Sequence, residues 1–351
     1  MTTVLDCIER IPHKLTTMLY ERKKRMYKLE QYIQGQDINE IVFVASGSSY
    51  NAAMATSSFF ERLGLSVRYV YPNIFVNYTN QFNSKALYIF ISQGGKTKLV
   101  FKSLQKIKAL GYNNIAITAH EDAPIAKIAD ISIEMGCDDE EFMYRTIGYS
   151  TTVVTCYQIA LTITNINHCI NEEKIEEYEN DFAAMIKNLP VIKERTLTWY
   201  QKHRFSLMHK DHMMFAGTHD LWAVCQEADI KVMEMVPLIS RSFELEEFIH
   251  GPQNAFDNTI MYFIFARKGE DDKKVNAIAQ FLKKEIGFCC IVGNLAKDSR
   301  DLYFDVESQY FSALEYVTVA QVIAYKLATD YGRDLSRPLN AKINDYIKKT
   351  L

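Results

Sequence analysis

Residues 89 to 97 read Ile-Phe-Ile-Ser-Gln-Gly-Gly-Lys-Thr, an apolar run that gives way to hydroxyls, an amide and two glycines just before a long helical pattern. This pattern predicts a buried strand, a turn in which Gly94 and Gly95 relieve steric hindrance, and a helix that begins near Thr97. The unpaired amide groups of that helix would face an anion held in the turn. The spacing matches neither a nucleotide P-loop nor a dinucleotide-binding glycine motif, which favours the phosphate of a small molecule. An ordinary strand-to-helix turn is the alternative.

Strands and helices alternate on both sides of this turn. In the first half we predict helices at 52–63 and 97–110 and strands at 41–45, 66–71, 86–91 and 114–118. In the second half we predict a final helix at about 310–330 and strands near 213–217, 237–243, 259–266 and 287–292. The strands are continuous apolar runs, which are typical of parallel sheets buried on both faces. The sequence therefore predicts an α/β fold of two doubly wound parallel-sheet domains in tandem, with ligand sites outside the carboxyl ends of the strands.

Segments with helical patterns flank and connect these two domains. We expect a helical segment at 1–34, a first domain at 35–170, a helical connector at 171–204, a second domain at 205–335 and a tail at 336–351.

Composition narrows the class of protein. A chain of 351 residues that is 48% hydrophobic can bury two cores, and its net charge of -3 gives no basic field for nucleic acid. No apolar run reaches the roughly 20 residues that a membrane span requires, and the first residues do not read as a signal peptide. Seven cysteines without regular spacing fit the reducing cytoplasm, and the adjacent Cys289 and Cys290 are expected to be buried hydrophobes. The histidines lack the spacing of metal ligands, so we expect neither metal nor cofactor.

Three turns in the first half are rich in hydroxyl groups. They are Ser46-Gly47-Ser48-Ser49-Tyr50, the stretch from Ser92 to Thr97, and Gly148-Tyr149-Ser150-Thr151-Thr152. Each turn alone fits a helix cap, because Ser and Thr are favoured at that position. Together they favour a phosphate site, since hydroxyl and backbone donors at one edge of a sheet can hold a dianion.

Glu227, Lys231 and Glu234 recur at spacings of four and three in the second half. These spacings place two carboxylates and an ammonium on one helix face. A surface ladder of salt bridges is the alternative, but the neighbouring residues are largely apolar. Partly desolvated charges are therefore expected, and a desolvated glutamate is a better general base.

Two further candidates lie later in the chain. Residues 247–252 read Glu-Phe-Ile-His-Gly-Pro, in which Gly and Pro end the local helix and fix His250 at a loop. A lone histidine is usually structural, and His250 becomes a catalytic candidate because a carboxylate lies nearby. The tail would ordinarily fray, although Lys342 could fold back over the site as an amine.

These motifs, in this order, resemble the SIS (sugar isomerase) family, specifically the two-domain isomerase portion of glucosamine-fructose-6-phosphate aminotransferase and its stand-alone relatives. The resemblance runs from about residue 35 to the tail, which is matched less well. It implies that a sugar phosphate is bound by Ser48, Ser49, Ser92, Gln93 and Thr97, and that Ser150 closes on the substrate.

The resemblance also implies roles for the residues of the second half. Glu234 would move a proton between C1 and C2 of the sugar, His250 would open the ring or shuttle protons, and Lys231 would stabilise enolate charge. Glu227 and Lys342 would support them. A homodimer is implied, in which His250 completes the site of the partner.

Departures from the family pattern suggest a subclass. Gly94 replaces a serine and Lys96 a glutamate of the phosphate loop, and Ile249 replaces a lysine before the histidine. The chain also begins at the isomerase module, so a glutamine-dependent reaction is not expected. It resembles the stand-alone fructosamine-6-phosphate deglycases more closely than the synthase type, which implies a deglycase or deaminase acting on a 6-phosphorylated amine-sugar adduct. The alternatives are an aldose-ketose phosphosugar isomerase and a non-catalytic sugar-phosphate-sensing module.

Overall fold

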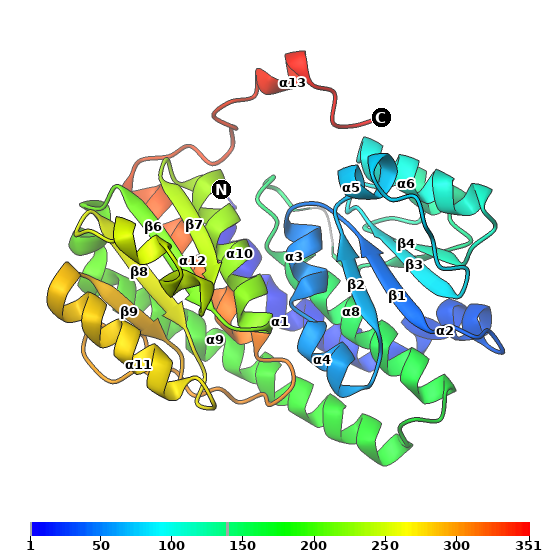
Figure 1. Cartoon of the computed structure of the whole chain (residues 1–351), viewed down its shortest axis with the longest axis horizontal. Helices are drawn as coiled ribbons and strands as arrows, with labels where there is room; N and C mark the ends of the chain where they lie inside the picture. Colours follow the sequence, from blue (N-terminus) through cyan, green and yellow to red (C-terminus); the bar gives the residue numbers. More distant parts are fainter. Residues whose placement is uncertain (1, 138–139) are drawn as a thin grey trace. The chain divides into compact units, whose positions relative to one another are not determined.

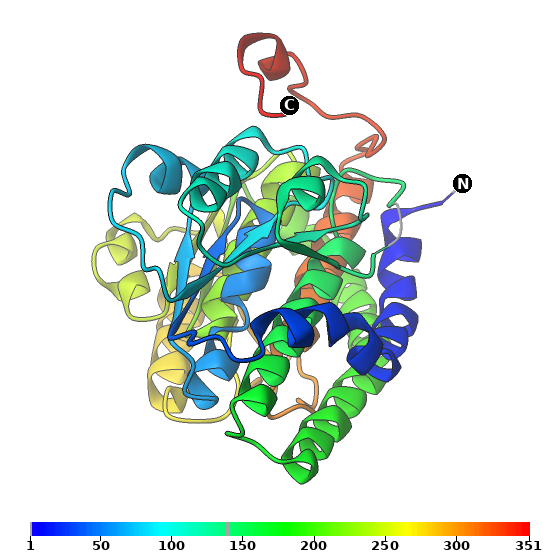
Figure 2. The same ribbon diagram turned by 90° about the vertical axis from the view of Figure 1, so that its right-hand side faces the viewer.

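The computed structural model describes residues 2–137 and 140–351, and the chain divides by its contacts into two units. The N-terminal unit comprises residues 13–180 and 337–351, and the C-terminal unit comprises residues 1–12 and 181–336. Each unit contains a parallel β-sheet between helices, as Figures 1 and 2 show. The predicted α/β fold with two doubly wound parallel sheets is therefore confirmed. The domain boundaries expected from the sequence are not the same as this division by contacts, and they stay a prediction.

The N-terminal unit is built around a five-stranded sheet with the order β2-β1-β3-β4-β5. Its elements are the second half of α1 (Val4–Tyr20), α2 (Arg22–Ile33), β1 (Glu40–Val44), α3 (Ser48–Met54), α4 (Ser57–Arg62), β2 (Val67–Val70), α5 (Pro72–Asn77), β3 (Ala86–Ile91), α6 (Lys98–Ala109), β4 (Asn114–Thr118), α7 (Pro124–Ile128), β5 (Ile131–Glu134), α8 (Ile147–Ile166), the start of α9 (Glu172–Met208) and α13 (Ile343–Tyr346).

Two sets of helices cover the two faces of this sheet. Val42, Tyr88 and Ala116 point to one face, where they pack against α5, α6 and α7. Phe43 points to the other face and meets Phe60 of α4 edge-on, with ring centroids 5.6 Å apart. Helix α8 packs on α2, α3 and α4. The direction of winding reverses between β1 and β3, so the carboxyl ends of these two strands form the topological switch point of the sheet.

The C-terminal unit repeats the plan with four strands in the order β7-β6-β8-β9. Its elements are the start of α1, most of α9, β6 (His212–Gly217), α10 (Asp220–Met235), β7 (Ile239–Glu244), η1 (Glu247–Ile249), η2 (Pro252–Ala255), β8 (Ile260–Phe265), α11 (Asp272–Phe281), the π-helical turn η3 (Leu282–Ile286), β9 (Cys289–Val292) and α12 (Ala313–Asp330).

Helix α10 and the short helix η1 cover opposite faces of this second sheet. Met214 and Ala216 of β6 belong to the apolar cluster that contains Phe248 of η1 and the buried residues of α11. Gly217 points the other way, because a Cβ atom on it would lie 3.0 Å from Cys225 Sγ of α10. Helix α10 also packs on α12. Figure 1 shows α10 and α11 on the two sides of the sheet.

Most predicted strands are present, and the differences have local causes. The single helix expected at 52–63 is wrong, because α3 and α4 are separated at Ala55 and Thr56, where the Thr56 hydroxyl donates to the Ala53 carbonyl. Strand β5 was not predicted, since only one of its four residues is fully buried. Cys289 and Cys290 are buried in β9 as expected, and burial raises the pKa of each thiol. Among the described residues, no helix is both long and apolar enough to cross a bilayer.

Candidate functional site

The turn after β3 is compact and carries its hydroxyl groups side by side. Ser92 Oγ lies 2.9 Å from Thr97 Oγ1, and the amide of Gly95 donates to the carbonyl of Ser92 over 2.9 Å. Gly95 has a φ of 61°, and a Cβ atom there would lie 2.6 Å from the Cβ of Ala123, so a larger residue would open the turn. Helix α6 begins at Lys98 without a side-chain cap, because the Thr97 hydroxyl is engaged by Ser92. The turn therefore presents hydroxyls and the first amides of a helix together.

The turn after β1 lies on the neighbouring strand. Gly47 takes a φ of 57° and a ψ of -137° at the start of α3, and Ser48 and Ser49 form the first turn of that helix. Because β1 and β3 pair directly, their carboxyl ends lie side by side. The structure thus brings Ser48 and Ser49 to the same sheet edge as Ser92 and Thr97, at the switch point where ligands of this fold class bind.

Ser150 differs from the other predicted phosphate ligands. It lies in the first turn of α8, is 1% exposed, and its hydroxyl donates to the Thr146 carbonyl over 3.2 Å. The start of α8 is instead occupied by Glu140, a residue that the sequence analysis did not single out. Its only signal in the sequence is a carboxylate shortly before a helix that begins with Thr and Gly. A phosphate-binding role for Ser150 stays a prediction.

Helix α10 brings Glu227, Lys231 and Glu234 together. Lys231 Nζ lies 3.1 Å from Glu227 Oε1 and 2.8 Å from Glu234 Oε2. The side chains of Lys231 and Glu227 are fully buried, whereas that of Glu234 is 39% exposed. Burial alone would lower the pKa of Lys231, but the two carboxylates outweigh it and hold the pKa above its ordinary value. The desolvation that the apolar neighbours predicted is therefore found, and it is strongest at Lys231 and Glu227.

His250 lies on the other face of the same sheet. It follows η1, its side chain is 58% exposed, and Nδ1 lies 2.9 Å from the carbonyl oxygen of Glu246. This hydrogen bond, with the Glu246 carboxylate 3.8 Å away, raises the pKa of the imidazole. Helix α10, which carries Glu234, packs on one face of this sheet, and the short helix η1, which precedes His250, packs on the opposite face. The two residues are not brought together by the fold of this unit.

Lys342 stands at the start of α13 in an exposed segment. The end of the tail pairs with the turn after β3 instead: the amide of Lys98 donates to the Lys349 carbonyl, and that of Leu351 donates to the Lys96 carbonyl. Thr97 and Thr350 form the antiparallel bridge between them. The role of Lys342 as an amine over the substrate stays a prediction.

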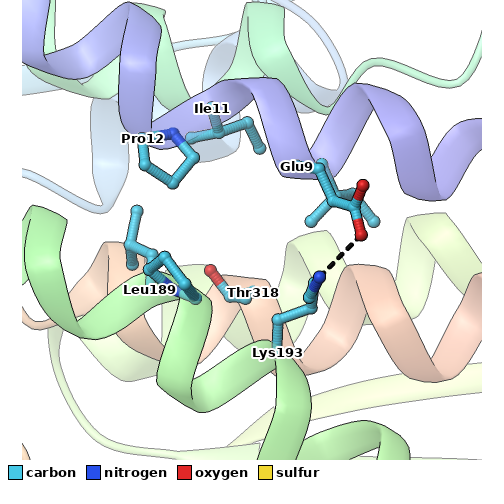
Figure 3. Close-up of a pocket in the computed structure, with 8 residues that line it drawn as sticks. Glu9, Ile11, Pro12, Leu189, Lys193 and Thr318 are labelled. Atoms are coloured by element: carbon cyan, nitrogen blue, oxygen red, sulfur yellow. Dashed lines mark hydrogen bonds and ion pairs between the residues drawn. The ribbon is translucent and has the colours of Figure 1, made fainter.

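A cavity of about 280 Å³ in the C-terminal unit is lined mainly by apolar groups (Figure 3). Its cation, Lys193, is held by the carboxylates of Glu9 and Glu194 at 2.6 and 2.9 Å. Because that charge is already neutralised, the cavity does not suit a phosphate, and the sheet edge of the N-terminal unit is the better candidate.

The chain is similar in sequence to known proteins. An isomerizing glutamine-fructose-6-phosphate aminotransferase of Clostridium tetani is 26% identical over 316 residues, which cover 88% of this chain and 52% of the relative. The chain thus spans about half the length of that curated relative.

Solved structures share the fold across nearly the whole chain. A Clostridium difficile 630 protein, named only provisionally as a phosphosugar isomerase, has a TM-score of 0.91 at 20% identity and covers 99% of this chain and 98% of its own. The glucosamine-6-phosphate deaminase of Thermotoga maritima has a TM-score of 0.74 at 21% identity, over 92% and 97% of the two chains. Residues 36–172 match the family model of the SIS domain. The chain therefore contains a SIS domain at residues 36–172, and the resemblance that its motifs indicated is confirmed.

Proposed function

We propose that the protein is a phosphosugar-processing enzyme that cleaves a 6-phosphorylated amine-sugar adduct into a sugar phosphate and an amine. The phosphate is held by the turns after β1 and β3, through Ser48, Ser49, Ser92, Gln93 and Thr97. Proton transfer is carried out by Glu234 with Lys231 beside it. No metal or cofactor takes part in this scheme, and the cytoplasm is its expected compartment.

The observation that carries an enzymatic function is the buried charge cluster of α10. A fully buried Lys231 between Glu227 and Glu234 costs desolvation energy that apolar residues of similar volume would avoid. Perturbed ionisable groups of this kind concentrate at catalytic sites. A module that only sensed a sugar phosphate would have no use for this cluster, so an enzyme is favoured over a binding module.

The exposure of the three residues suggests their division of labour. Glu234 is partly exposed and can reach a substrate, so it is assigned as the general base that takes a proton from C1 of the adduct and returns it to C2. Lys231 stays protonated because of its raised pKa, and it would balance the negative charge that develops on the C2 oxygen when C1 loses its proton. Glu227 keeps that ammonium in place.

The cleavage step follows from the proton transfer. Moving one proton from C1 to C2, while the nitrogen loses its proton and the C2 oxygen gains one, turns the ketoamine into an imine at C1 with a hydroxyl at C2. Water then adds across the carbon-nitrogen double bond, the nitrogen leaves as the amine, and C1 becomes the aldehyde of the sugar phosphate. Binding energy from the distant phosphate would hold C1 and C2 against the base.

His250 is assigned to the site of a second copy of the chain. The elements next to His250 and Glu234 pack on opposite faces of the sheet in the C-terminal unit, which favours their serving different sites. The exposed imidazole at a loop is free to approach a partner. A homodimer in which each copy supplies a histidine to the other is therefore part of the proposal.

The names of similar proteins leave two enzymatic alternatives. The Thermotoga maritima protein is named a deaminase, which removes nitrogen, and the Clostridium difficile protein is provisionally named an isomerase, which does not. An aldose-ketose isomerase would use the same enediol chemistry without carbon-nitrogen cleavage. Lys96, which stands in the phosphate loop where the resembled family has a glutamate, favours an adduct with an additional anionic group such as an amino acid.

The direct test is a panel of 6-phosphorylated fructosyl amino acids and amino sugars, assayed for released amine and for sugar phosphate. We expect amine release from at least one phosphorylated adduct and none from its unphosphorylated counterpart. The matched variant Glu234→Gln should lose at least about a hundredfold in turnover, as expected for loss of a general base, while its affinity for the phosphate is kept.

Three outcomes separate the candidates. Interconversion of hexose 6-phosphates without amine release would identify the isomerase alternative. Tight binding of sugar phosphate with no turnover would identify a sensing module. Near-normal turnover of Glu234→Gln with amine release intact would refute the assignment of the base.

A further inference from the structure

We propose that Glu140 is a positioning residue of the phosphate site: its buried carboxylate, together with the bare backbone of Gly148, forms a seat that holds the side-chain amide of Gln93. This inference rests on the proposed function, because it takes Gln93 as a phosphate ligand. It adds two residues to that site: Glu140, which no sequence motif includes, and Gly148, which begins the third hydroxyl-rich turn.

The carboxylate of Glu140 fills the amino end of α8. Oε1 accepts hydrogen bonds from the amides of Thr146 and Ile147 at 2.8 and 2.9 Å and from the Thr146 hydroxyl at 3.0 Å, and Oε2 accepts from the amide of Gly148 at 3.0 Å. The side chain is 1% exposed. A helix of 20 residues carries partial positive charge at its start, so an ionised carboxylate is stable there. These amides are consequently not available to a substrate phosphate.

Gln93 lies directly on this arrangement. Its Nε2 atom makes a long hydrogen bond of 3.5 Å to Glu140 Oε2, and its backbone carbonyl accepts from the amide of Ala119 at 2.8 Å. A Cβ atom on Gly148 would lie 2.2 Å from Gln93 Oε1 and 2.8 Å from its Cδ. Only glycine at this position leaves room for the amide in the observed place.

The seat has a consequence for phosphate binding. A primary amide has two N–H groups on its nitrogen, and Glu140 accepts from one of them. This contact fixes which end of the amide is the donor, and it leaves the second N–H for a phosphate oxygen. Holding the donor in place before the substrate arrives lowers the entropic cost of binding.

A double-mutant cycle tests whether Glu140 acts through Gln93. The affinity for glucose 6-phosphate, with inorganic phosphate as a second probe, is measured by calorimetry for wild type, Glu140→Gln, Gln93→Ala and the double variant. Glu140→Gln should weaken binding about 5- to 20-fold, as expected for loss of a charge-assisted hydrogen bond, with little change in kcat. In the Gln93→Ala background the same substitution should have no further effect. Equal weakening in both backgrounds would overturn the proposal.

The variant Gly148→Ala provides a second test if Glu140→Gln folds poorly, because its added methyl group would displace the side-chain amide of Gln93. Alanine favours the helix, so its melting temperature should stay level or rise by about 1–3 °C, while affinity falls as in Glu140→Gln. Wild-type affinity of Gly148→Ala would overturn the proposal. Thr97→Val is the control for the proposed function. If this variant binds both probes normally, the phosphate loop is wrongly assigned. If Thr97→Val binds weakly but Glu140→Gln and Gln93→Ala have additive effects, only the proposed seat is contradicted.

Discussion

Replacement of Lys231 by methionine is the strongest test of the charge cluster in α10. The substitution leaves Glu227, whose side chain is fully buried, without the ammonium 3.1 Å away. At an effective dielectric constant of about 20, two unit charges at this distance attract by roughly 5 kcal/mol. Removal of one partner of a buried pair costs about 3–5 kcal/mol. A carboxylate without its cation can instead take up a proton, which costs about 4 kcal/mol at pH 7 for an ordinary carboxyl group, so we expect a loss of about 3–4 kcal/mol.

The same reasoning predicts how the loss depends on pH. In Lys231→Met, protonation of the Glu227 carboxylate costs only about 1 kcal/mol at pH 5, so most of the destabilisation should disappear at that pH. Tryptophan fluorescence can follow the unfolding of this unit, because both tryptophans, Trp199 and Trp222, lie in the C-terminal unit with α10. With a urea dependence of about 2 kcal/mol per molar, the fluorescence midpoint of Lys231→Met should fall by about 1.5–2 M at pH 7 and by about 0.5 M at pH 5.

A matched control removes both charges. The variant Glu227→Gln/Lys231→Met leaves no buried ion of this pair and should regain most of the lost midpoint at pH 7, while turnover stays abolished. If Lys231→Met unfolds within about 0.3 M of wild type at pH 7, or loses the same amount at both pH values, the buried pair does not have the energetic role assigned here.

Three further predictions follow from other parts of the molecule. Burial raises the pKa of Glu315 from 4.5 to about 7, so the folded state binds this proton more tightly than the unfolded state does. The resulting stabilisation of the folded state is complete below pH 4.5 and is lost as the pH rises to about 7. It amounts to about 3 kcal/mol. Glu315→Gln should flatten that part of the dependence of the urea midpoint on pH, and an unchanged slope would contradict the assignment. His219 has a φ of 56° and a ψ of -121°, so His219→Gly should relieve strain and raise the free energy of unfolding by about 1 kcal/mol; a lower melting temperature would contradict this. Mixing Glu234→Gln with His250→Ala should restore about one quarter of wild-type activity if the site is shared between copies, and no recovery would place both residues in one copy.

Much of the fold could be predicted from neighbouring residues. Continuous apolar runs identify β1, β3, β4 and β8, because a strand buried on both faces has no polar side to alternate with. Gly95 could be assigned to a tight turn because few other residues tolerate its backbone conformation. The spacing of Glu227, Lys231 and Glu234 predicted their common helix face, since the helical repeat is a local property.

Other features depend on residues that are distant along the chain. Strand β5 is short and half exposed, and it is defined by its pairing with β4 rather than by its own composition. The seat of Gln93 joins residues about fifty positions apart, and no periodic pattern marks Glu140 as a member.

The motifs and their order along the chain were enough to indicate the SIS resemblance, the glycine turn after β3 and the charged helix, because each of these depends on residues that are near one another in the sequence. The sequence could not say that Lys231 is fully buried while Glu234 remains partly exposed, or that α10 and η1 pack on opposite faces of one sheet. Burial and the side of a sheet on which a residue lies are set by packing among distant segments, and only the folded chain contains that information.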